Sequence, residues 1–459
     1  LGDVYKRQEE YRVKRAENVL DWGLLPHLGK NPEDRISKAL FIGEAVCKLI
    51  EYKLGWIPAD DKDHYGNKVI RLAGQLLADL FRTCFRNLVK DMKYQLEHSG
   101  QKRGMGVVNV AIRPGIITDK LRNAIATGNW GRGKVGITQL LDRTNYLSTI
   151  SHLRRIQSPL SRSQPNFEAR DLHPTHFGRV CPCETPEGSN CGLVKNLALS
   201  AIISVAADPK EIMNVITQIG LIPYKDASIE AKMNGARVFL DGGVVGYVLD
   251  PEGFCKEFRS MRRSGLIPSD VSIYLKVPPN PNAETRIYIN TYSGRVLRPL
   301  IIVKNGVPQL KREDLELVLK GKMSWRELLK RGELELVDAN EEENCYIATS
   351  LDELTPEHTH LELSMTGMLG AVASIIPYAE HNQSPRNTYE SAMAKQALGF
   401  PTPVYKHLMN VRSHLLVYPQ TPMVTTGSFE MLNLDKRPIG QNAVVAVLSY
   451  DCYNIEDAI

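Results

Sequence analysis

HNQSPRNTYESAMAKQALG (residues 381–399) joins a helix start to polar side chains at helical spacing. Ser384 can cap a helix, and Pro385 suits its first turn. No helix breaker follows before Leu398, so the stretch predicts a helix over residues 385–398.

Four side chains of this predicted helix share one stripe at about 3.6 residues per turn: Arg386, Tyr389, Met393 and Gln396. The stripe combines a guanidinium, a phenol and an amide. These groups can hold a phosphate, stack on a base and hydrogen-bond a base or ribose. An amphipathic helix whose arginine pairs with a surface acid is the plainer interpretation of the stripe by itself.

A second informative stretch is GQNAVVAVLSYDCYNIEDAI (residues 440–459). Its apolar, β-branched run at residues 443–448 predicts a buried strand. A polar turn follows, in which Glu456 and Asp457 are neighbours. Adjacent carboxylates repel each other unless a cation lies near them, and oxygen ligands suit Mg²⁺. Two solvated loop acids are the alternative.

Together these two stretches resemble the second-largest subunit of cellular multi-subunit RNA polymerases. Residues 151–199 look like the fork region of that subunit, and residues 60–82 look like its protrusion in the archaeal and eukaryal style. The resemblance runs from about residue 10 to the last residue. It implies a multidomain α+β fold.

The resemblance also implies a division of the chain into parts. In order, these are the end of a helical lobe (1–55), the C-terminal part of the protrusion (56–130), the fork (131–203), two small mixed external domains (204–278 and 279–348) and the start of a β-rich hybrid-binding domain (349–459). Because the first residue is not methionine and the chain stops just after Asp457, we expect a piece of a longer subunit.

Composition agrees with a multidomain globular protein. A chain of 459 residues suggests about three or more domains, and 43% hydrophobic with 24% charged residues is ordinary for globular material. The longest apolar runs are far too short to span a membrane. Eight scattered cysteines fit a reducing compartment, so we expect a cytoplasmic protein.

Charge is unevenly distributed behind a net charge of +5. Residues 101–163 hold eleven lysines and arginines against two acids. This basic stretch can follow a phosphate backbone or form a solvated basic face. Residues 331–357 hold nine acids against one base, and we expect them to face water or a basic partner.

Two tempting motifs are rejected. GRGKVG (residues 131–136) matches a dinucleotide loop, but it lacks a preceding strand, and arginines stand where the acidic residue should follow. A second set could suggest zinc: His173, His176, Cys181, Cys183 and Cys191. Only one residue separates Cys181 from Cys183, and three prolines stiffen this segment, so no zinc is expected here.

The resemblance implies nucleotidyl transfer assisted by two Mg²⁺ ions, with pyrophosphate as the leaving group. In the family, an aspartate triad of the largest subunit holds the tighter ion, and no such pattern occurs in this chain. Glu456 and Asp457 match the acidic pair near the second ion, which Asp457 would approach, directly or through water. Arg386 matches the arginine that contacts the incoming triphosphate.

Further residues carried over from the family line the nucleic acid. Tyr389 and Gln396 match neighbours of the nucleotide and hybrid site, and Lys395 is a weaker candidate because it lies off the stripe. Four arginines flank the polar loop at residues 157–168, which matches the fork loop at the downstream edge of the transcription bubble: Arg154, Arg155, Arg162 and Arg170.

The implied partners are the largest and other polymerase subunits, template DNA, the RNA–DNA hybrid and nucleoside triphosphates, with no membrane. The chain is not expected to be active alone. One alternative is a module that binds nucleic acid or assists assembly without chemistry of its own. Another is a metal-dependent transferase for small nucleotides, against which the incomplete set of metal ligands argues.

Overall fold

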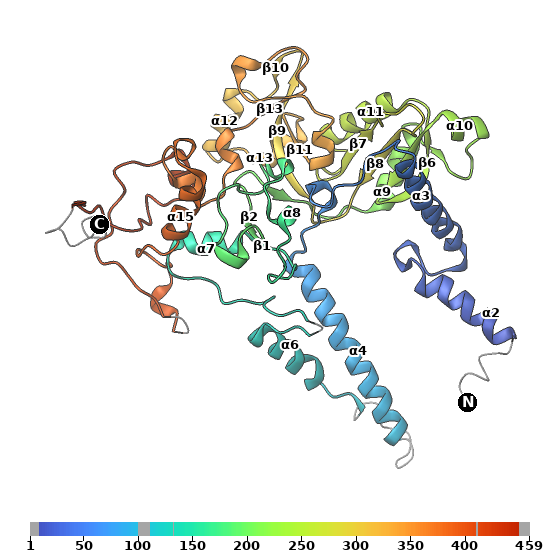
Figure 1. The fold of residues 1–459 in the computed structure, drawn as a ribbon, viewed down its shortest axis with the longest axis horizontal. Helices are drawn as coiled ribbons and strands as arrows, with labels where there is room; N and C mark the ends of the chain where they lie inside the picture. Colours follow the sequence, from blue (N-terminus) through green and yellow to red (C-terminus); the bar gives the residue numbers. More distant parts are fainter. Residues whose placement is uncertain (1–8, 100–110, 132, 410–411, 449–459) are drawn as a thin grey trace, which may run out of the picture. The chain divides into compact units, whose positions relative to one another are not determined.

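The computed structural model of this chain describes residues 9–99, 111–131, 133–409 and 412–448 (Figure 1). The chain divides into two compact units. The first unit comprises residues 1–70, 173–179 and 200–367, and the second comprises residues 71–172, 180–199 and 368–459. Each unit is therefore assembled from segments that lie far apart in the sequence. The fold is α+β and multidomain.

The first unit contains most of the strands. Its helices are α2 (Glu9–Asn18), α3 (Arg35–Lys53), α9 (Pro209–Gln218), α10 (Ile229–Asn234), α11 (Pro251–Arg263), α12 (Arg312–Leu319), α13 (Trp325–Lys330) and α14 (Ala339–Glu342). Its strands are β3 (Ile202–Ile203), β4 (Ile222–Pro223), β5 (Ala236–Leu240), β6 (Gly243–Val248), β7 (Ser272–Lys276), β8 (Arg286–Asn290), β9 (Val296–Lys304), β10 (Val307–Pro308), β11 (Leu334–Val337), β12 (Ile347–Ala348) and β13 (His360–Glu362).

A five-stranded sheet in this unit has the order β4-β6-β5-β8-β7. The sequence Asp241-Gly242-Gly243 between two apolar runs predicts a hairpin, and strands β5 and β6 form it around Asp241 and Gly242. Both turn residues have positive φ (48° and 84°), as a type I′ turn requires. Strands β5 and β8 pair in parallel, whereas the other neighbours are antiparallel.

Helices α9 and α11 supply apolar side chains to the core on this sheet. In α11, Phe254 and Phe258 are buried at helical spacing, and both belong to the same cluster as Val238 and Ile287 of the strands. Helix α3 contacts this sheet through an ion pair. The Glu51 carboxylate of α3 lies 2.9 Å from the Arg286 guanidinium of β8.

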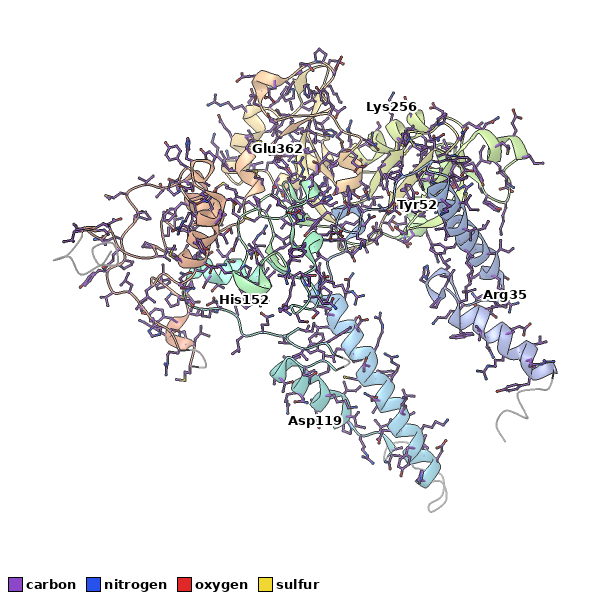
Figure 2. All side chains as sticks on the ribbon, viewed as in Figure 1. Arg35, Tyr52, Asp119, His152, Lys256 and Glu362 are labelled. Atoms are coloured by element: carbon purple, nitrogen blue, oxygen red, sulfur yellow. The ribbon has the colours of Figure 1, made fainter. Side chains whose placement is uncertain are left out.

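A six-stranded sheet is built around the long strand β9. Strands β10, β11, β13 and β3 all pair with β9, and β12 joins the edge of β13 in parallel. Glu362 of β13, labelled in Figure 2, forms an ion pair with Arg298 of β9. The apolar run at residues 300–303 predicts a strand, and it forms part of the longer strand β9.

In the described part of the second unit, the regular secondary structure is mainly helical. Its helices and strands are α4 (Ala73–Ser99), α6 (Gly115–Thr127), α7 (Tyr146–Leu153), β1 (Arg155–Gln157), α8 (Phe167–Arg170), β2 (Val194–Asn196), α15 (Ser384–Ala394) and α16 (Gly427–Met431). Helices α4 and α6 pack together through Leu80, Cys84 and Ala124 (Figure 1). Strands β1 and β2 form an antiparallel pair.

Two expectations from the sequence are wrong. Residues 443–448 form no strand, and Val444 and Val447 are almost fully exposed. A strand needs a partner for its backbone groups, and none pairs with this run among the described residues. The apolar periodicity of residues 67–97 predicts one long helix, but α4 starts only at Ala73. The Ile70 N–H donates to the Gly294 carbonyl (2.8 Å) and holds the segment before the helix extended.

No helix in the described part of the chain combines the length and the apolar character that crossing a bilayer requires.

Candidate nucleotide and nucleic-acid interface

Helix α15 carries most of the candidate nucleotide-binding residues. It begins at Ser384, and Gln383 precedes it as a cap residue without a side-chain capping bond. The expected capping role of Ser384 is therefore wrong, because this residue already lies in the first turn beside Pro385. The helix ends at Ala394, earlier than residue 398, and a turn continues to Gln396, whose N–H donates to the Met393 carbonyl (2.9 Å).

Two faces of α15 differ in burial. Asn387, Ser391 and Ala394 are buried, whereas the predicted stripe is exposed: Arg386, Tyr389, Met393 and Gln396. The four residues that the helical spacing groups together are therefore all exposed, and we call their side of α15 the outer face.

Arg386 and Tyr389 interact on this outer face. The central carbon of the guanidinium lies 5.4 Å from the centroid of the phenol ring, which is within cation–π range. No acid within the described ranges forms an ion pair with Arg386. The plainer interpretation of the stripe, an arginine paired with a surface acid, therefore has no support in this part of the chain.

Lys395 is directed toward a buried carboxylate. Its ammonium nitrogen lies 3.5 Å from Oε1 of Glu184, which is 1% exposed and also accepts a hydrogen bond from the Ser151 hydroxyl (2.6 Å). Lys395 therefore differs from the exposed stripe residues, because it has a partner within the protein.

Two of the four fork arginines are held by backbone carbonyls. Arg154 donates to the carbonyl of Ala198. Burial lowers the Arg154 pKa, and the charge of Glu184 partly opposes this shift. Arg170 donates to the carbonyls of three residues: Pro165 (2.8 Å), Ser189 (2.8 Å) and Cys191 (2.7 Å). These contacts fold the polar loop onto the segment that precedes β2.

The other two fork arginines are more accessible. Arg155 lies on β1 with its side chain exposed, and Arg162 is exposed and bonded through Nε to the side-chain oxygen of Asn190. A neutral amide leaves the positive charge of Arg162 uncompensated. Arg155 and Arg162 are therefore the better placed of the four to contact a phosphate.

Glu456 and Asp457 lie outside the described residues, so their geometry does not enter this site. Among the residues that are described, no three histidine, cysteine, aspartate or glutamate side chains gather as metal ligands. In the rejected zinc set, His173 pairs with Asp61 (2.7 Å). Burial raises the pKa of Cys181 to about 11, which disfavours the thiolate that zinc requires.

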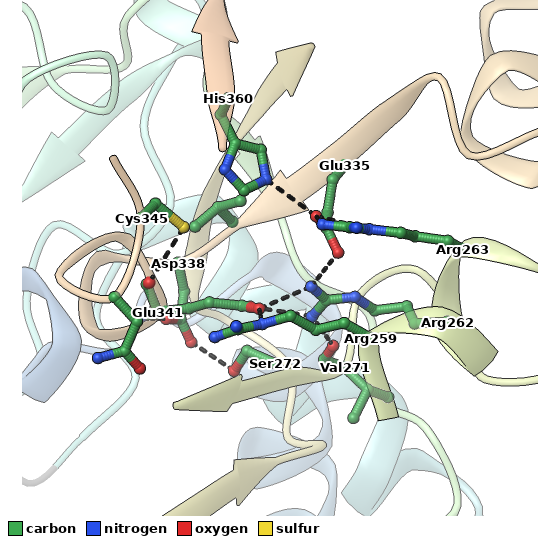
Figure 3. Close-up of polar contacts among 12 residues, drawn as sticks. Arg259, Arg262, Arg263, Val271, Ser272, Glu335, Asp338, Glu341, Cys345 and His360 are labelled. Atoms are coloured by element: carbon green, nitrogen blue, oxygen red, sulfur yellow. Dashed lines mark hydrogen bonds and ion pairs between the residues drawn. The ribbon is translucent and has the colours of Figure 1, made fainter. Parts of the chain in front are cut away.

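Sequence reasoning missed the buried partners of the acidic stretch at residues 331–357. Glu335 and Glu341 are buried and pair with Arg262, at the end of α11 (Figure 3). The Glu335 carboxylate also pairs with Arg263 (2.6 Å) and His360 (3.0 Å). The basic partner of these acids is therefore in the same chain. Glu335 lies on a strand and Glu341 on a helix six residues later, so neither strand nor helix periodicity in the sequence indicates that the two acids share a partner.

Sequence reasoning also missed Asn145, whose side chain is completely buried between α7 and the end of α15. Only its position before a short helical pattern could have indicated a capping role.

Comparison with known protein families covers most of the chain. Five families match, each described as a domain of RNA polymerase Rpb2: domain 2 (residues 1–71), domain 3 (139–203), domain 4 (238–304), domain 5 (325–388) and domain 6 (372–459). Helix α15 lies within the overlap of the domain 5 match and the domain 6 match for part of its length.

Several curated relatives are similar over nearly the whole chain. DNA-directed RNA polymerase subunit Rpo2 of Saccharolobus shibatae is 47% identical over 99% of this chain and 41% of its own length. Rpo2 of Sulfolobus acidocaldarius is 46% identical over the same shares. DNA-directed RNA polymerase II subunit RPB2 of Encephalitozoon cuniculi is 38% identical over 98% of this chain and 40% of its own length.

The chain thus spans about two fifths of the length of the relatives it matches. Five matching domains in the order of one subunit, together with 46–47% identity to archaeal proteins, agree with the motifs in the sequence. The chain therefore belongs to the Rpb2/Rpo2 family, the second-largest subunits of multi-subunit DNA-directed RNA polymerases, and to its archaeal type.

Proposed function

We propose that this chain works within a DNA-directed RNA polymerase and that the outer face of α15 contacts the incoming nucleoside triphosphate. The names of the relatives support DNA-templated RNA synthesis as the activity of the assembled enzyme. The largest subunit and the other polymerase subunits are the protein partners, and the template, the RNA–DNA hybrid and the triphosphate are the ligands. The setting is the cytoplasm, which the free cysteines of the described residues suit.

The availability of the Arg386 guanidinium carries this proposal. It is exposed, it lies over the Tyr389 ring, and no acid of the described part of the chain neutralises it. A guanidinium can donate two parallel hydrogen bonds to phosphate oxygens, and its charge stabilises the negative charge that develops there during transfer. The ring contact limits the orientations of a flexible side chain before substrate binds.

Gln396 and Tyr389 extend this face beyond the triphosphate contact. An amide can hydrogen-bond a base or ribose, and a phenol ring can stack on a base. Lys395 adds positive charge beside the RNA–DNA hybrid. Its ion pair with Glu184 keeps the ammonium group close to the protein. Arg155 and Arg162 contact phosphates near the point of strand separation, whereas Arg154 and Arg170 hold the polar loop between them in shape.

The acidic pair Glu456 and Asp457 fits Mg²⁺ in donor chemistry, because carboxylate oxygens are the ligands that this ion prefers. Two carboxylates are fewer than the ligands that Mg²⁺ needs, so the triphosphate, water and another subunit would supply the others. When bound, Mg²⁺ supplies charge stabilisation to the oxygens of the phosphoryl group in transfer. Asp457 would hold the second Mg²⁺ ion, directly or through water. No zinc is assigned to this chain.

The domain boundaries expected from the resemblance also belong to this proposal: 1–55 for the end of the lobe, 56–130 for the protrusion, 131–203 for the fork, 204–278 and 279–348 for the external domains and 349–459 for the hybrid-binding domain. The two compact units each draw on several of these parts.

The test is Arg386→Ala in the full-length subunit, assembled with its partner subunits on a primer–template scaffold. We expect single-nucleotide addition at subsaturating triphosphate to slow by about 10²-fold, as when other transition-state donors are removed. Arg326→Ala is a matched control, since Arg326 is another exposed arginine over an aromatic ring, 6.0 Å from the centroid of Trp325. Equal rates for the Arg386 variant and the control would overturn the proposal.

A further inference from the structure

The Asn145 side chain joins two helices of the second unit. Its Oδ1 accepts a hydrogen bond from the Ser148 N–H (2.7 Å) and so caps the N-terminus of α7. Its Nδ2 donates to the carbonyls of Ala394 (3.0 Å) and Ala397 (2.8 Å), where α15 ends. The residue is 0% exposed, so water cannot replace these bonds.

The bond to Ala394 meets a general need of helix ends, whereas Ala397 lies in the segment that follows α15. The last carbonyls of an α-helix have no partner within the helix and carry partial negative charge. Ala394 is the last residue of α15, and both it and Asn145 are buried. If α15 moved relative to α7, it would leave buried donors and acceptors unpaired, which is costly.

Two more contacts hold the same helix from the same side. The Thr388 hydroxyl donates to the Cys183 carbonyl (2.7 Å), and Lys395 approaches Glu184. Leu147 of α7 and Ala394 of α15 also belong to one buried apolar cluster. The helix is therefore fixed along its inner face, while Arg386 projects from the outer face.

We propose that Asn145 is a positioning residue for nucleotide addition, because it fixes α15 and thereby the place of the Arg386 guanidinium. This inference rests on the proposed function, in which Arg386 contacts the triphosphate. Asn145 itself touches no substrate. Its effect is geometric, since small displacements of a group that acts in the transition state cost large factors in rate.

The test uses Asn145→Ser, again in the full-length subunit of an assembled polymerase. Serine is also a good helix cap, so the start of α7 is kept, but its short side chain provides no amide to reach the α15 carbonyls. We expect the maximal rate of single-nucleotide addition to fall about tenfold. Asn31→Ser is the control, because Asn31 occupies the N-cap position of a short 3₁₀ helix (Pro32–Asp34) in the first unit, and its substitution should leave the rate unchanged.

A double variant separates positioning from loss of structure. If Asn145 acts through Arg386, Asn145→Ser should slow an Arg386→Ala enzyme less than about twofold, because the group to be positioned is absent. A merely structural role would reduce the rate by the same factor in both backgrounds, and this result would overturn the inference. A normal rate of nucleotide addition for the single Asn145→Ser variant would also overturn the inference.

Thr388→Val is a second variant in case Asn145→Ser fails to assemble. It removes the bond to Cys183 while keeping the shape of the side chain, and we expect about a threefold loss of rate with the same dependence on Arg386. Strictly additive loss would count against the inference. A normal rate for the Arg386→Ala enzyme would instead overturn the proposed function. The single Asn145 and Thr388 variants do not test that function, so the two failures can be told apart.

Discussion

The guanidinium of Arg386 lies over the Tyr389 ring, with 5.4 Å between its central carbon and the ring centroid. The two residues are neighbours on the outer face of α15, less than one helical turn apart. The tyrosine therefore has two possible uses, to stack on a base and to hold the arginine in place. Both uses depend on the ring and not on the hydroxyl, and substitutions at Tyr389 can test this.

Tyr389→Phe keeps the ring and should leave the apparent triphosphate affinity nearly unchanged. Tyr389→Ala removes the ring, and we expect that affinity to fall about threefold to fivefold, which corresponds to an exposed cation–π contact of about 0.5–1 kcal/mol. Single-nucleotide addition over a range of triphosphate concentrations measures both variants. Equal losses of triphosphate affinity for Tyr389→Phe and Tyr389→Ala would show that the hydroxyl, and not the ring, supports triphosphate binding.

The fork arginines should fall into two classes. Arg155→Gln removes an exposed charge, and we expect the salt dependence of scaffold binding to weaken by about one unit in log–log slope, as for one lost phosphate contact. Arg170→Gln removes bonds to three carbonyls instead. It should increase proteolysis within the loop at residues 157–168 while the slope changes little. If instead Arg170→Gln changed the salt slope and Arg155→Gln increased proteolysis, Arg170 would be the phosphate contact and Arg155 the residue that holds the loop.

Asp457→Asn tests the acidic pair. An amide lacks the negative charge of a carboxylate, so we expect the Mg²⁺ concentration for half-maximal elongation to rise by about threefold to tenfold. Asp451→Asn is the matched control from the same stretch and should not shift the titration. Superimposable Mg²⁺ curves for the two variants would leave Asp457 as a solvated acid.

Features governed by neighbouring residues were predictable from the sequence. The β5–β6 hairpin follows from Asp241 and Gly242, which tolerate positive φ, and α11 follows from its apolar periodicity after a capping Asp250. The exposed face of α15 was predictable for the same reason. In each case, residues within a few positions of each other determine the conformation.

Features that depend on distant partners were not predictable. Asn145 meets carbonyls about 250 positions later in the chain, and no spacing rule connects them. The run at residues 443–448 has the composition of a strand, yet composition does not supply the partner that a strand needs. The acids of residues 331–357 look like a solvated face until the fold brings arginines of α11 against them.

Glu335 provides the last prediction, because its ionised form is held in a buried site. Burial by itself would raise the Glu335 pKa, but the charge of Arg262 and bonds from His360 and Arg263 lower it well below its ordinary value (Figure 3). A carboxyl whose pKa is lower in the folded state contributes stability above its unfolded pKa, near 4.5. That contribution is lost progressively as the pH falls below this value toward the folded pKa.

We therefore expect hydrogen exchange of the β11 amides in the full-length subunit to be slow at neutral pH and, after correction for intrinsic rates, less protected below about pH 4.5. Glu335→Gln should weaken this protection already at neutral pH, by about 3–5 kcal/mol, since it leaves buried arginine charge uncompensated.

Glu353→Gln is the control. The pKa of Glu353 is also lowered, by hydrogen bonds from Thr349, but its side chain is exposed, so neutral protection should not change. If Glu335→Gln left the neutral protection of β11 intact, the ion pairs of Glu335 with Arg262 and Arg263 would contribute nothing net to the stability of this sheet.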